Sequence, residues 1–466
     1  MFDIRDGSRV IHFIGLGGIG VSGLAEILHS IGYSVQGSDI CRSQNIERLE
    51  RIGITAFVGH DKEHVNNAGI VVYSSAIRQD NPELIRAKEL KIPCLTRAEM
   101  LSQIVRLKKS VVVAGSHGKT TVTSMCAAVL EMASLSPTVI NGGIINSYKT
   151  NAKLGAGDWA VVESDESDGS FVTLFPTIGI VTNIDREHIN HYGSFDNLKL
   201  AFKSFLNNLP FYGAGIVCLD DAHVREVIDD ITDRNIVTYS IAGDSMFRAI
   251  NIKKTAIGST FDVKIHDSFL ENISIPLLGD HNILNALSAI AVATELKVDL
   301  DLVKSTLASF SGVSRRFTLL GDIRGISFVD DYAHHPTEIR TLIRAAQQKT
   351  DGKIVIVCQP HRFTRLNILF KEFCECFDGA SLVIITSVYR ADDAEEDPDI
   401  PSKNLYDALR KAGKDAIFAA DEADVAASIS DLINNNVLND GDIILFAGAG
   451  SISRWAYNIY EELSNS

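Results

Sequence analysis

The sequence VVVAGSHGKTT, at residues 111–121, decides the fold of the central part of the chain. Its apolar run predicts a buried strand, and the pattern that follows predicts a helix from Lys119 to Met132. A glycine-rich turn between a strand and a helix is typical of a Walker A loop, whose backbone N–H groups cradle phosphates. Val113 occupies the position of the first glycine of the full pattern, but the GxxGKTT core is intact.

Residues 115–121, the second glycine loop, have the side chains that phosphate chemistry requires. We expect Lys119 to reach the β- and γ-phosphates of a nucleotide and Thr120 to bind Mg²⁺. The other loop residues expected at the phosphates are Gly115, Ser116, His117, Gly118 and Thr121. The alternative is a structural glycine turn with a solvated lysine.

A first glycine loop, residues 15–20, follows a predicted strand at Val10–Ile14. It matches the GxGxxG pattern and is expected to bind a diphosphate through its glycines, Gly15, Gly17, Gly18 and Gly20. Asp39 lies 19 residues after the last of them, where it could bind a ribose hydroxyl. The pattern leaves open whether the ligand is NAD or another diphosphate nucleotide. Two phosphate loops in one chain favour an ATP-using enzyme that acts on a nucleotide-linked substrate.

The chain length predicts several domains. At about 150 residues per domain, 466 residues correspond to about three domains. Strands predicted at Trp159–Glu163 and Ile354–Cys358 alternate with helical patterns, which indicates an α/β fold with parallel, doubly wound sheets. We place the domains at residues 1–107, 108–312 and 313–466.

Composition narrows the possible partners. The net charge of −15 argues against general binding to nucleic acid or to an anionic membrane. No apolar run approaches the roughly 18 residues of a membrane-spanning helix, and the first ten residues lack the apolar segment of a signal peptide. We therefore expect a cytoplasmic protein.

Acidic residues follow the strand at Trp159–Glu163. The stretch ESDESDGSF contributes four carboxylates, Glu163, Asp165, Glu166 and Asp168. Carboxylate oxygens are preferred Mg²⁺ ligands, and His188 follows a second predicted strand, Ile178–Thr182, at the same sheet edge. The sequence therefore predicts a metal site, although charge runs and single histidines are often only solvated surface.

Together these segments resemble the Mur ligases, the ATP-dependent amide-forming enzymes of peptidoglycan precursor synthesis. The resemblance covers essentially the whole chain and is strongest for the alanine-adding branch. It rests on HFIGLGGIGVSGLAEIL (12–28), GSHGKTT (115–121), ESDESDGSF (163–171), VTNIDREHIN (181–190), GDHNILNALSA (279–289), RRF (315–317), DDYAHHPTEI (330–339), QPHRFTRL (359–366) and GAGSI (448–452).

The resemblance implies a Rossmann-like N-terminal domain for the UDP substrate, a central P-loop ATPase domain and a Rossmann-like C-terminal domain for the amino acid. It assigns the first glycine loop, Asp39 and His60 to UDP-N-acetylmuramate, and Lys119, Thr120, Glu163 and His188 to ATP and Mg²⁺. Adenine recognition would fall to Asn282 and Asn285, and closure over the nucleotide to Arg316 and Asp331. The set at the amino acid and the reaction centre would be Tyr332, His334, Arg362 and Arg365.

The implied activity joins L-alanine to the lactyl carboxylate of UDP-N-acetylmuramate in the bacterial cytoplasm. The implied protein is a monomer or a weak homodimer with no nucleic-acid or membrane partner. Three alternatives stay open: a ligase that joins recycled tripeptide to the same substrate, an NAD-dependent oxidoreductase, and a non-catalytic UDP-sugar-binding regulator. The second glycine loop argues against the oxidoreductase, and the retained Lys119, Glu163 and His188 argue against the regulator.

Overall fold

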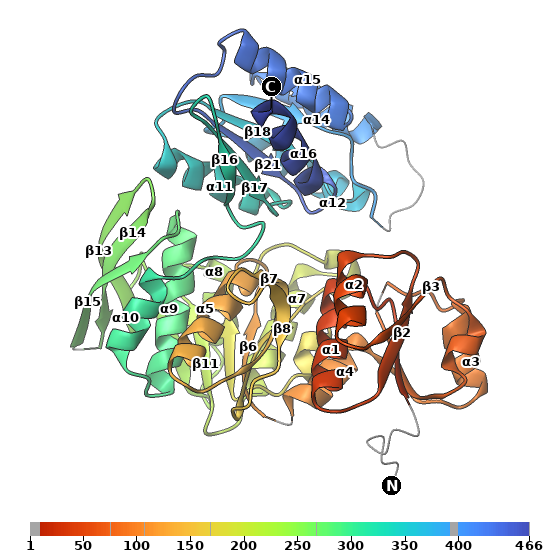
Figure 1. The fold of residues 1–466 in the computed structure, drawn as a ribbon. Coiled ribbons are helices and arrows are strands. Elements are labelled where there is room, and N and C mark those ends of the chain that lie inside the picture. Colours follow the sequence, from red (N-terminus) through yellow and green to blue (C-terminus); the bar gives the residue numbers. More distant parts are fainter. Residues whose placement is uncertain are drawn as a thin grey trace. The chain divides into compact units, whose positions relative to one another are not determined.

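A computed structural model describes residues 10–74, 76–106, 108–167, 169–266, 268–391 and 399–465 (Figure 1). Asp168 and the first nine residues, on which two of the expectations above depend, lie outside these ranges. The chain forms two compact units. The first contains residues 1–252, 261–275 and 283–312, and the second contains residues 253–260, 276–282 and 313–466.

The N-terminal sheet of the first unit has five parallel strands in the order β3-β2-β1-β4-β5. The order reverses direction between β1 and β4, and such a switch point opens a crevice at the carboxyl ends of the strands. The elements are β1 (Val10–Ile14), α1 (Ile19–Ser30), β2 (Val35–Asp39), α2 (Gln44–Arg51), β3 (Thr55–Val58), the 3₁₀ helix η2 (Lys62–Val65), β4 (Ala68–Tyr73), α3 (Pro82–Glu89), β5 (Cys94–Thr96) and α4 (Arg97–Val105).

The second sheet has ten strands in the order β15-β14-β13-β12-β11-β10-β6-β9-β7-β8. Its first strand in the chain, β6, lies between β10 and β9 and leads into the second glycine loop. The elements are β6 (Lys109–Ala114), α5 (Lys119–Met132), β7 (Thr138–Ile145), β8 (Thr150–Lys153), β9 (Trp159–Glu163), the 3₁₀ helix η3 (Ser170–Thr173), β10 (Ile178–Val181), α6 (Ile189–Tyr192), α7 (Phe195–Asn207), β11 (Ala214–Cys218), α8 (Ala222–Ile228), β12 (Ile236–Ser240), β13 (Phe247–Thr255), β14 (Gly258–Ile265), β15 (Ser268–Ile275), α9 (Asp280–Glu295) and α10 (Leu300–Ala308).

The third sheet has six strands in the order β16-β17-β21-β18-β19-β20. Alternate residues of β18 belong to two different apolar clusters, with Ile356 in one and Val355 in the other, so both faces of this sheet are covered. The elements are β16 (Thr318–Ile323), β17 (Ile326–Asp331), α11 (Pro336–Lys349), β18 (Ile354–Cys358), α12 (Phe363–Ile368), α13 (Phe370–Glu375), β19 (Leu382–Ile385), α14 (Asp399–Lys411), β20 (Ala416–Phe418), α15 (Glu422–Asn434), β21 (Ile443–Ala447) and α16 (Ile452–Ser464).

The first two sheets share one apolar core. Buried residues of β1 and α1 fall in the same cluster as buried residues of β6 and β9. The close approach of α1 to β8 explains this, because a Cβ added at Gly23 would lie 2.9 Å from the Cβ of Ala152. The N-terminal and central sheets therefore form one compact unit although each has its own glycine loop.

The expected α/β class with three sheets is confirmed, but the sheets are not wholly parallel. β7 pairs antiparallel with β8, and β16 pairs antiparallel with β17. Arg324 and Gly325 form the turn between β16 and β17, and both have positive φ angles, which are typical of a tight hairpin turn. The prediction of parallel pairing rested on strands that alternate with helices. A two-residue turn that joins two neighbouring strands does not appear in that pattern.

One glutamine ties distant parts of the second unit together. Gln348, on α11, accepts a hydrogen bond from the backbone N–H of Gly279 (2.8 Å). Its amide donates to the carbonyl oxygens of Thr255 (3.0 Å) and Gly258 (2.9 Å). The segments 253–260 and 276–282 are thereby held by the C-terminal part of the chain.

None of the described helices is both long enough and apolar enough to cross a membrane.

Candidate active site

The second glycine loop adopts a backbone that requires its glycines. Gly115 and Gly118 have φ angles of +130° and +83°. A Cβ at Gly115 would lie 2.1 Å from Thr182 Oγ1, and one at Gly118 would lie 2.9 Å from Asn285 Oδ1. The loop is thus pressed between the end of β10 and α9, which explains why the GxxG spacing appears here.

Residues after β10 hold the loop in place. The backbone N–H of His117 donates to Asn183 Oδ1 (2.8 Å), and Asn183 Nδ2 donates back to the carbonyl oxygen of His117 (3.0 Å). The His117 ring contacts Asp185 Oδ2 at 3.0 Å, and the backbone N–H of Asp185 donates to Ser116 Oγ. Thr121 is buried in the first turn of α5.

Lys119 lies inside the loop with its charge balanced by carboxylates. Its Nζ donates to the carbonyl oxygens of Gly115 (2.6 Å) and Ser116 (3.1 Å) and forms a 2.7 Å ion pair with Glu166 Oε2. Burial alone would lower the pKa of Lys119, but the charges of Glu166 and Asp165 raise it above its usual value. Lys119 is therefore a permanent cation at the start of α5.

The predicted metal residues fall into two neighbouring groups. Thr120 Oγ1 donates to Glu163 Oε1 (3.1 Å), and Glu163 Oε2 accepts the backbone N–H of Gly142 (2.6 Å). His188 lies instead with Glu166 and Glu187, and one ligand atom from each of these three lies within 4.8 Å of the others. His188 caps α6 in the left-handed conformation, with φ +55°.

The donor set fits a hard divalent cation. Glu166 is almost fully buried, and its Oε1 has no hydrogen-bond partner among the described residues. Burial and the negative charges of Asp165 and Glu187 raise the pKa of Glu166 to about 7, against the opposing effect of Lys119. A buried, unpaired carboxylate oxygen beside an imidazole is an arrangement that a metal ion would stabilise.

The first glycine loop is held by residues at the end of β2. The backbone N–H groups of Gly15 and Leu16 both donate to the carbonyl oxygen of Ser38 (2.9 Å each). The N–H of Gly17 donates to Asp39 Oδ2 (2.8 Å). Asp39, expected to bind the ribose, therefore uses one oxygen to fix the loop, while Gly18 and Gly20 lead into α1.

Two further side chains lie beside this loop. His60 contacts Ser38 Oγ and Glu83 Oε2 through its Nδ1. The guanidinium of Arg97 approaches the loop closely, because a Cβ at Gly20 would lie 3.3 Å from Arg97 Nη1. Arg97 also lies 4.0 Å from Asp165, so it connects the loop to the acidic stretch after β9.

The two asparagines of α9 have different surroundings. Asn285 is buried against Gly118 of the second glycine loop. Asn282 donates to the carbonyl oxygen of Leu278 (2.8 Å) and contacts the ring of His281 (3.0 Å). Asn285 is therefore in contact with the loop that we expect to bind ATP, whereas Asn282 orders the first turn of its own helix.

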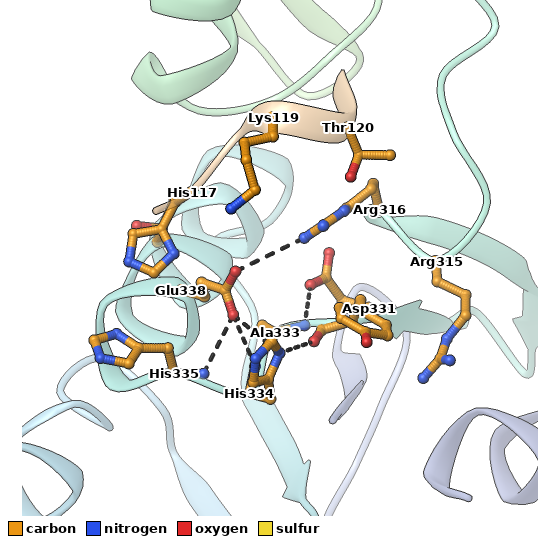
Figure 2. Close-up of polar contacts among 12 residues, drawn as sticks. His117, Lys119, Thr120, Arg315, Arg316, Asp331, Ala333, His334, His335 and Glu338 are labelled. Carbon is orange, nitrogen blue, oxygen red and sulfur yellow. Dashed lines mark hydrogen bonds and ion pairs between the residues drawn. The ribbon is translucent and has the colours of Figure 1, made fainter. Parts of the chain in front are cut away.

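In the second unit, Asp331 and Glu338 organise the end of β17, as Figure 2 shows. Asp331 accepts the backbone N–H groups of Phe317 (2.7 Å) and Ala333 (2.8 Å), and burial raises its pKa to about 6. Glu338 Oε2 accepts the backbone N–H groups of His334 and His335. Its Oε1 lies 3.9 Å from Arg316 Nη1.

The other predicted residues of this unit lie near His334 and His361. The ring of His361 lies 5.8 Å from that of His334, which in turn lies 5.2 Å from the ring of Tyr332. Arg365 donates to the carbonyl oxygen of His361 (3.2 Å), and Arg362 precedes α12 with φ +70°. Burial and nearby positive charges lower the pKa of His361 to about 3, so its ring is neutral. The cationic groups here suit a carboxylate ligand.

The comparisons with known proteins agree over the whole chain. Family models match residues 10–109 (Mur ligase family, catalytic domain), 113–293 (Mur ligase middle domain) and 315–450 (Mur ligase, glutamate ligase domain). A protein of Methylorubrum populi named UDP-N-acetylmuramate–L-alanine ligase is 48% identical over 461 residues, which are 97% of each chain. The chain belongs to the Mur ligase family. In this Mur ligase the motif resemblance is therefore confirmed.

Solved structures extend this comparison. A UDP-N-acetylmuramate–alanine ligase of Thermotoga maritima is 30% identical, with a TM-score of 0.83 over 98% of this chain and 99% of that one. A murein peptide ligase of Psychrobacter arcticus has a TM-score of 0.74 over the same shares, but at 22% identity it shows the fold alone.

Sequence reasoning missed three residues that lie beside the predicted site residues. Glu338 had a signal, because it stands three residues after His335 at the start of α11, where an acid completes a capping box. His361 stands within the quoted QPHRFTRL motif, but only the structure shows that it lies among the cations. Arg97 had no sequence signal, because its contact with Gly20 depends on how α4 packs.

Proposed function

We infer that this Mur ligase joins L-alanine to the lactyl carboxylate of UDP-N-acetylmuramate in an ATP-dependent reaction that releases ADP and phosphate. The inference rests on two curated relatives that are named for this activity. They are 46% and 48% identical to this chain, and the matches cover at least 97% of both sequences. The product is a precursor of peptidoglycan. Retention of Lys119 in a built phosphate loop supports a working enzyme over a non-catalytic regulator.

The reaction requires activation because a carboxylate oxygen is a poor leaving group. ATP transfers its γ-phosphoryl group to the lactyl carboxylate and forms an acyl phosphate. The amine of L-alanine then attacks the acyl carbon, and phosphate leaves from the tetrahedral intermediate. The protein contributes mainly positioning and charge neutralisation.

The second glycine loop is our proposed ATP site. Lys119 would neutralise charge on the transferring phosphoryl group, as its raised pKa keeps it cationic. The loop residues 115–121 would hold the phosphates, and Asn282 and Asn285 would contact adenine. Mg²⁺, when bound, would offset phosphate charge, with Thr120, Glu163 and His188 as ligands and Glu166 as a further candidate.

The first glycine loop is our proposed site for the UDP moiety. Gly15, Gly17 and Leu16 direct their N–H groups into the protein, which leaves the first turn of α1 for the diphosphate. Asp39 and His60 would lie near the uridine, and Arg97 would add positive charge.

The second unit would bind the amino acid. Arg362 or Arg365 would hold the carboxylate of alanine, since a guanidinium matches a carboxylate in a bidentate pair. Tyr332 and His334 would lie near the reacting amine. Arg316 and Asp331 would turn toward the nucleotide during the reaction.

The boundaries 1–107, 108–312 and 313–466 remain our proposed domains, each with its own substrate. We also propose that the protein works in the bacterial cytoplasm as a monomer or a weak homodimer.

One experiment separates the proposed activity from its rival. The protein is incubated with UDP-N-acetylmuramate, ATP, Mg²⁺ and either L-alanine or the tripeptide, and phosphate release and product mass are measured. We expect release with L-alanine. Release with tripeptide but not with alanine would identify a recycling ligase, and no nucleotide turnover with either amine would reject both.

A further inference from the structure

A buried carboxylate lies at the centre of a polar cluster in the N-terminal sheet. Glu83, at the start of α3, is fully buried. Three histidines and one serine face its side chain, and we call these five residues the Glu83 cluster: His12, Ser38, His60, His64 and Glu83. Neither the motifs nor the proposed function accounts for a fully buried acid at this place.

The cluster saturates the carboxylate with donors. Glu83 Oε2 accepts from Ser38 Oγ (2.5 Å) and lies 3.2 Å from His60 Nδ1. Glu83 Oε1 lies 2.7 Å from His64 Nδ1. Burial raises the pKa of Glu83, but the interactions of its carboxylate with His12, Ser38 and His64 outweigh burial and hold the pKa at about 2. An ionised carboxylate only accepts hydrogen bonds, so each nitrogen that faces it carries a proton.

The fully buried His12 shows that its neighbours in the cluster determine which ring nitrogen carries the proton. Its Nδ1 lies 3.1 Å from Gln36 Nε2, an amide donor, so Nδ1 is the acceptor and Nε2 carries the proton. That Nε2 points at Glu83 Oε2 from 3.5 Å and has no hydrogen-bond partner among the described residues. Glu83 is therefore the group that compensates this buried N–H.

The same argument assigns the tautomer of His60. Both of its contacts, with Ser38 Oγ and with Glu83, are made by Nδ1, which must carry the proton toward the carboxylate. In a neutral imidazole the other nitrogen is then an acceptor. The side chain is 15% exposed, so Nε2 is the nitrogen available to a ligand.

The cluster is joined directly to the first glycine loop. Ser38 gives its hydroxyl proton to Glu83 and its carbonyl oxygen to the N–H groups of Gly15 and Leu16. The backbone of Asp39 accepts the N–H of Gly59, the residue before His60. His60 and the loop are therefore positioned by the same pair of residues at the end of β2.

We propose that Glu83 is a positioning residue that holds His60 with its proton on Nδ1, so that Nε2 accepts a hydrogen bond from the uridine of the UDP substrate. The partner would be a ribose hydroxyl or the imide N–H of uracil, since both are donors. The proposal rests on the proposed function, because it assumes that the first loop binds a UDP-linked sugar.

Two measurements on the full chain test the proposal. Nitrogen-15 NMR of labelled histidines should show protonated Nδ1 and unprotonated Nε2 in His60. Calorimetry should show that Glu83→Gln, whose amide offers one acceptor and two donors in place of the carboxylate, binds UDP-N-acetylmuramate about tenfold more weakly. The affinity for ATP should not change. Glu89→Gln is the matched control, because Glu89 lies on the same helix but is exposed and pairs with Arg86.

A second pair of variants keeps the test valid if Glu83→Gln does not fold. The amide of His60→Gln reaches the position of Nε2, whereas that of His60→Asn reaches only that of Nδ1, so His60→Gln should retain more UDP-substrate affinity. A proton on Nε2 of His60, unchanged binding by Glu83→Gln, or equal losses in the two His60 variants would overturn the proposal. Absence of UDP-N-acetylmuramate binding by the wild-type protein would instead overturn the proposed function.

Discussion

The two glycine loops have the same plan and opposite electrostatics. Each follows the first strand of its sheet, and in each the third residue gives its backbone N–H to a side chain from a neighbouring strand end. In the first loop Gly17 donates to the carboxylate of Asp39, and in the second His117 donates to the neutral amide of Asn183. The second loop contains Lys119, which pairs with Glu166 from the acidic stretch after β9, whereas the first loop has no charged residue of its own.

This difference teaches that glycine spacing alone does not identify a ligand. The spacing predicts the turn, but the groups around the turn decide which charge it can accept. A loop with a buried lysine suits a triphosphate with its metal ion, whereas a loop without a lysine leaves the charge of a diphosphate to the N-terminus of α1 and to Arg97.

The largest effect is expected from removing Lys119, the charged residue that the second loop has and the first loop lacks. Lys119→Ala leaves the transferring phosphoryl group without its cation, so turnover should fall by roughly a factor of 10³. Phosphate release measures this, and calorimetry should show unchanged binding of UDP-N-acetylmuramate. Lys203→Ala is the control, because Lys203 pairs with the exposed Asp230, and it should retain activity. Equal losses in both variants would contradict the role of Lys119.

Acid should weaken the support of the first loop. The pKa of Glu83 is about 2 in the folded protein and near its ordinary value when unfolded. Its stabilisation, about 3 kcal/mol, is therefore complete above the unfolded pKa and is lost as the pH falls toward the folded pKa. Denaturant unfolding should show that the stability difference between the wild type and Glu83→Gln shrinks from neutral to strongly acidic pH. A difference independent of pH would contradict this, and Glu89→Gln should show none.

Making the second loop resemble the first should impair ATP use. Asn183→Asp adds a negative charge beside the proposed phosphate site and removes the amide that donates to His117. A like charge at about 8 Å costs roughly 2 kcal/mol near a protein surface, so kcat/KM for ATP should fall about 30-fold. Steady-state kinetics with saturating UDP substrate and alanine measure this. A change confined to the KM for UDP-N-acetylmuramate would show that the two loops are assigned the wrong way round.

The reverse exchange should have the smallest effect. Asp39→Asn replaces the charge-assisted hydrogen bond from Gly17 by a weaker neutral one, so the loop is held less firmly and the affinity for UDP-N-acetylmuramate should fall about tenfold while the KM for ATP is unchanged. Isothermal calorimetry and kinetics measure the two quantities. An affinity that is unaltered would show that Asp39 is only a packing residue.

Local signals in the sequence predicted most of the fold. The strands at Val10–Ile14 and Ile354–Cys358 and the helix at Lys119–Met132 have the predicted bounds, because a mostly apolar run or a glycine before a helix is a strong local signal. The hairpin of β16 and β17 was missed, since its turn is only Arg324 and Gly325.

The sequence predicted those residues of the candidate site that stand in motifs, but not which residues they contact. Lys119 and Glu163 stand in motifs, but the partner of Lys119 is Glu166, and this choice among neighbouring acids depends on how the strand ends pack. Glu83 could not be found at all, because its partners come from four separate segments of the N-terminal domain.

The bonds made by Gln348 have a consequence for cutting the chain into fragments. Residues 253–260 and 276–282 precede the third sheet in sequence, yet their backbone is bound from α11. A fragment that ends at residue 312 would leave Thr255, Gly258 and Gly279 without that amide. A fragment that begins at residue 313 would contain Gln348 without its acceptors. Dissection of this enzyme should therefore preserve both segments together with α11, and limited proteolysis between the units should release fragments that stay associated.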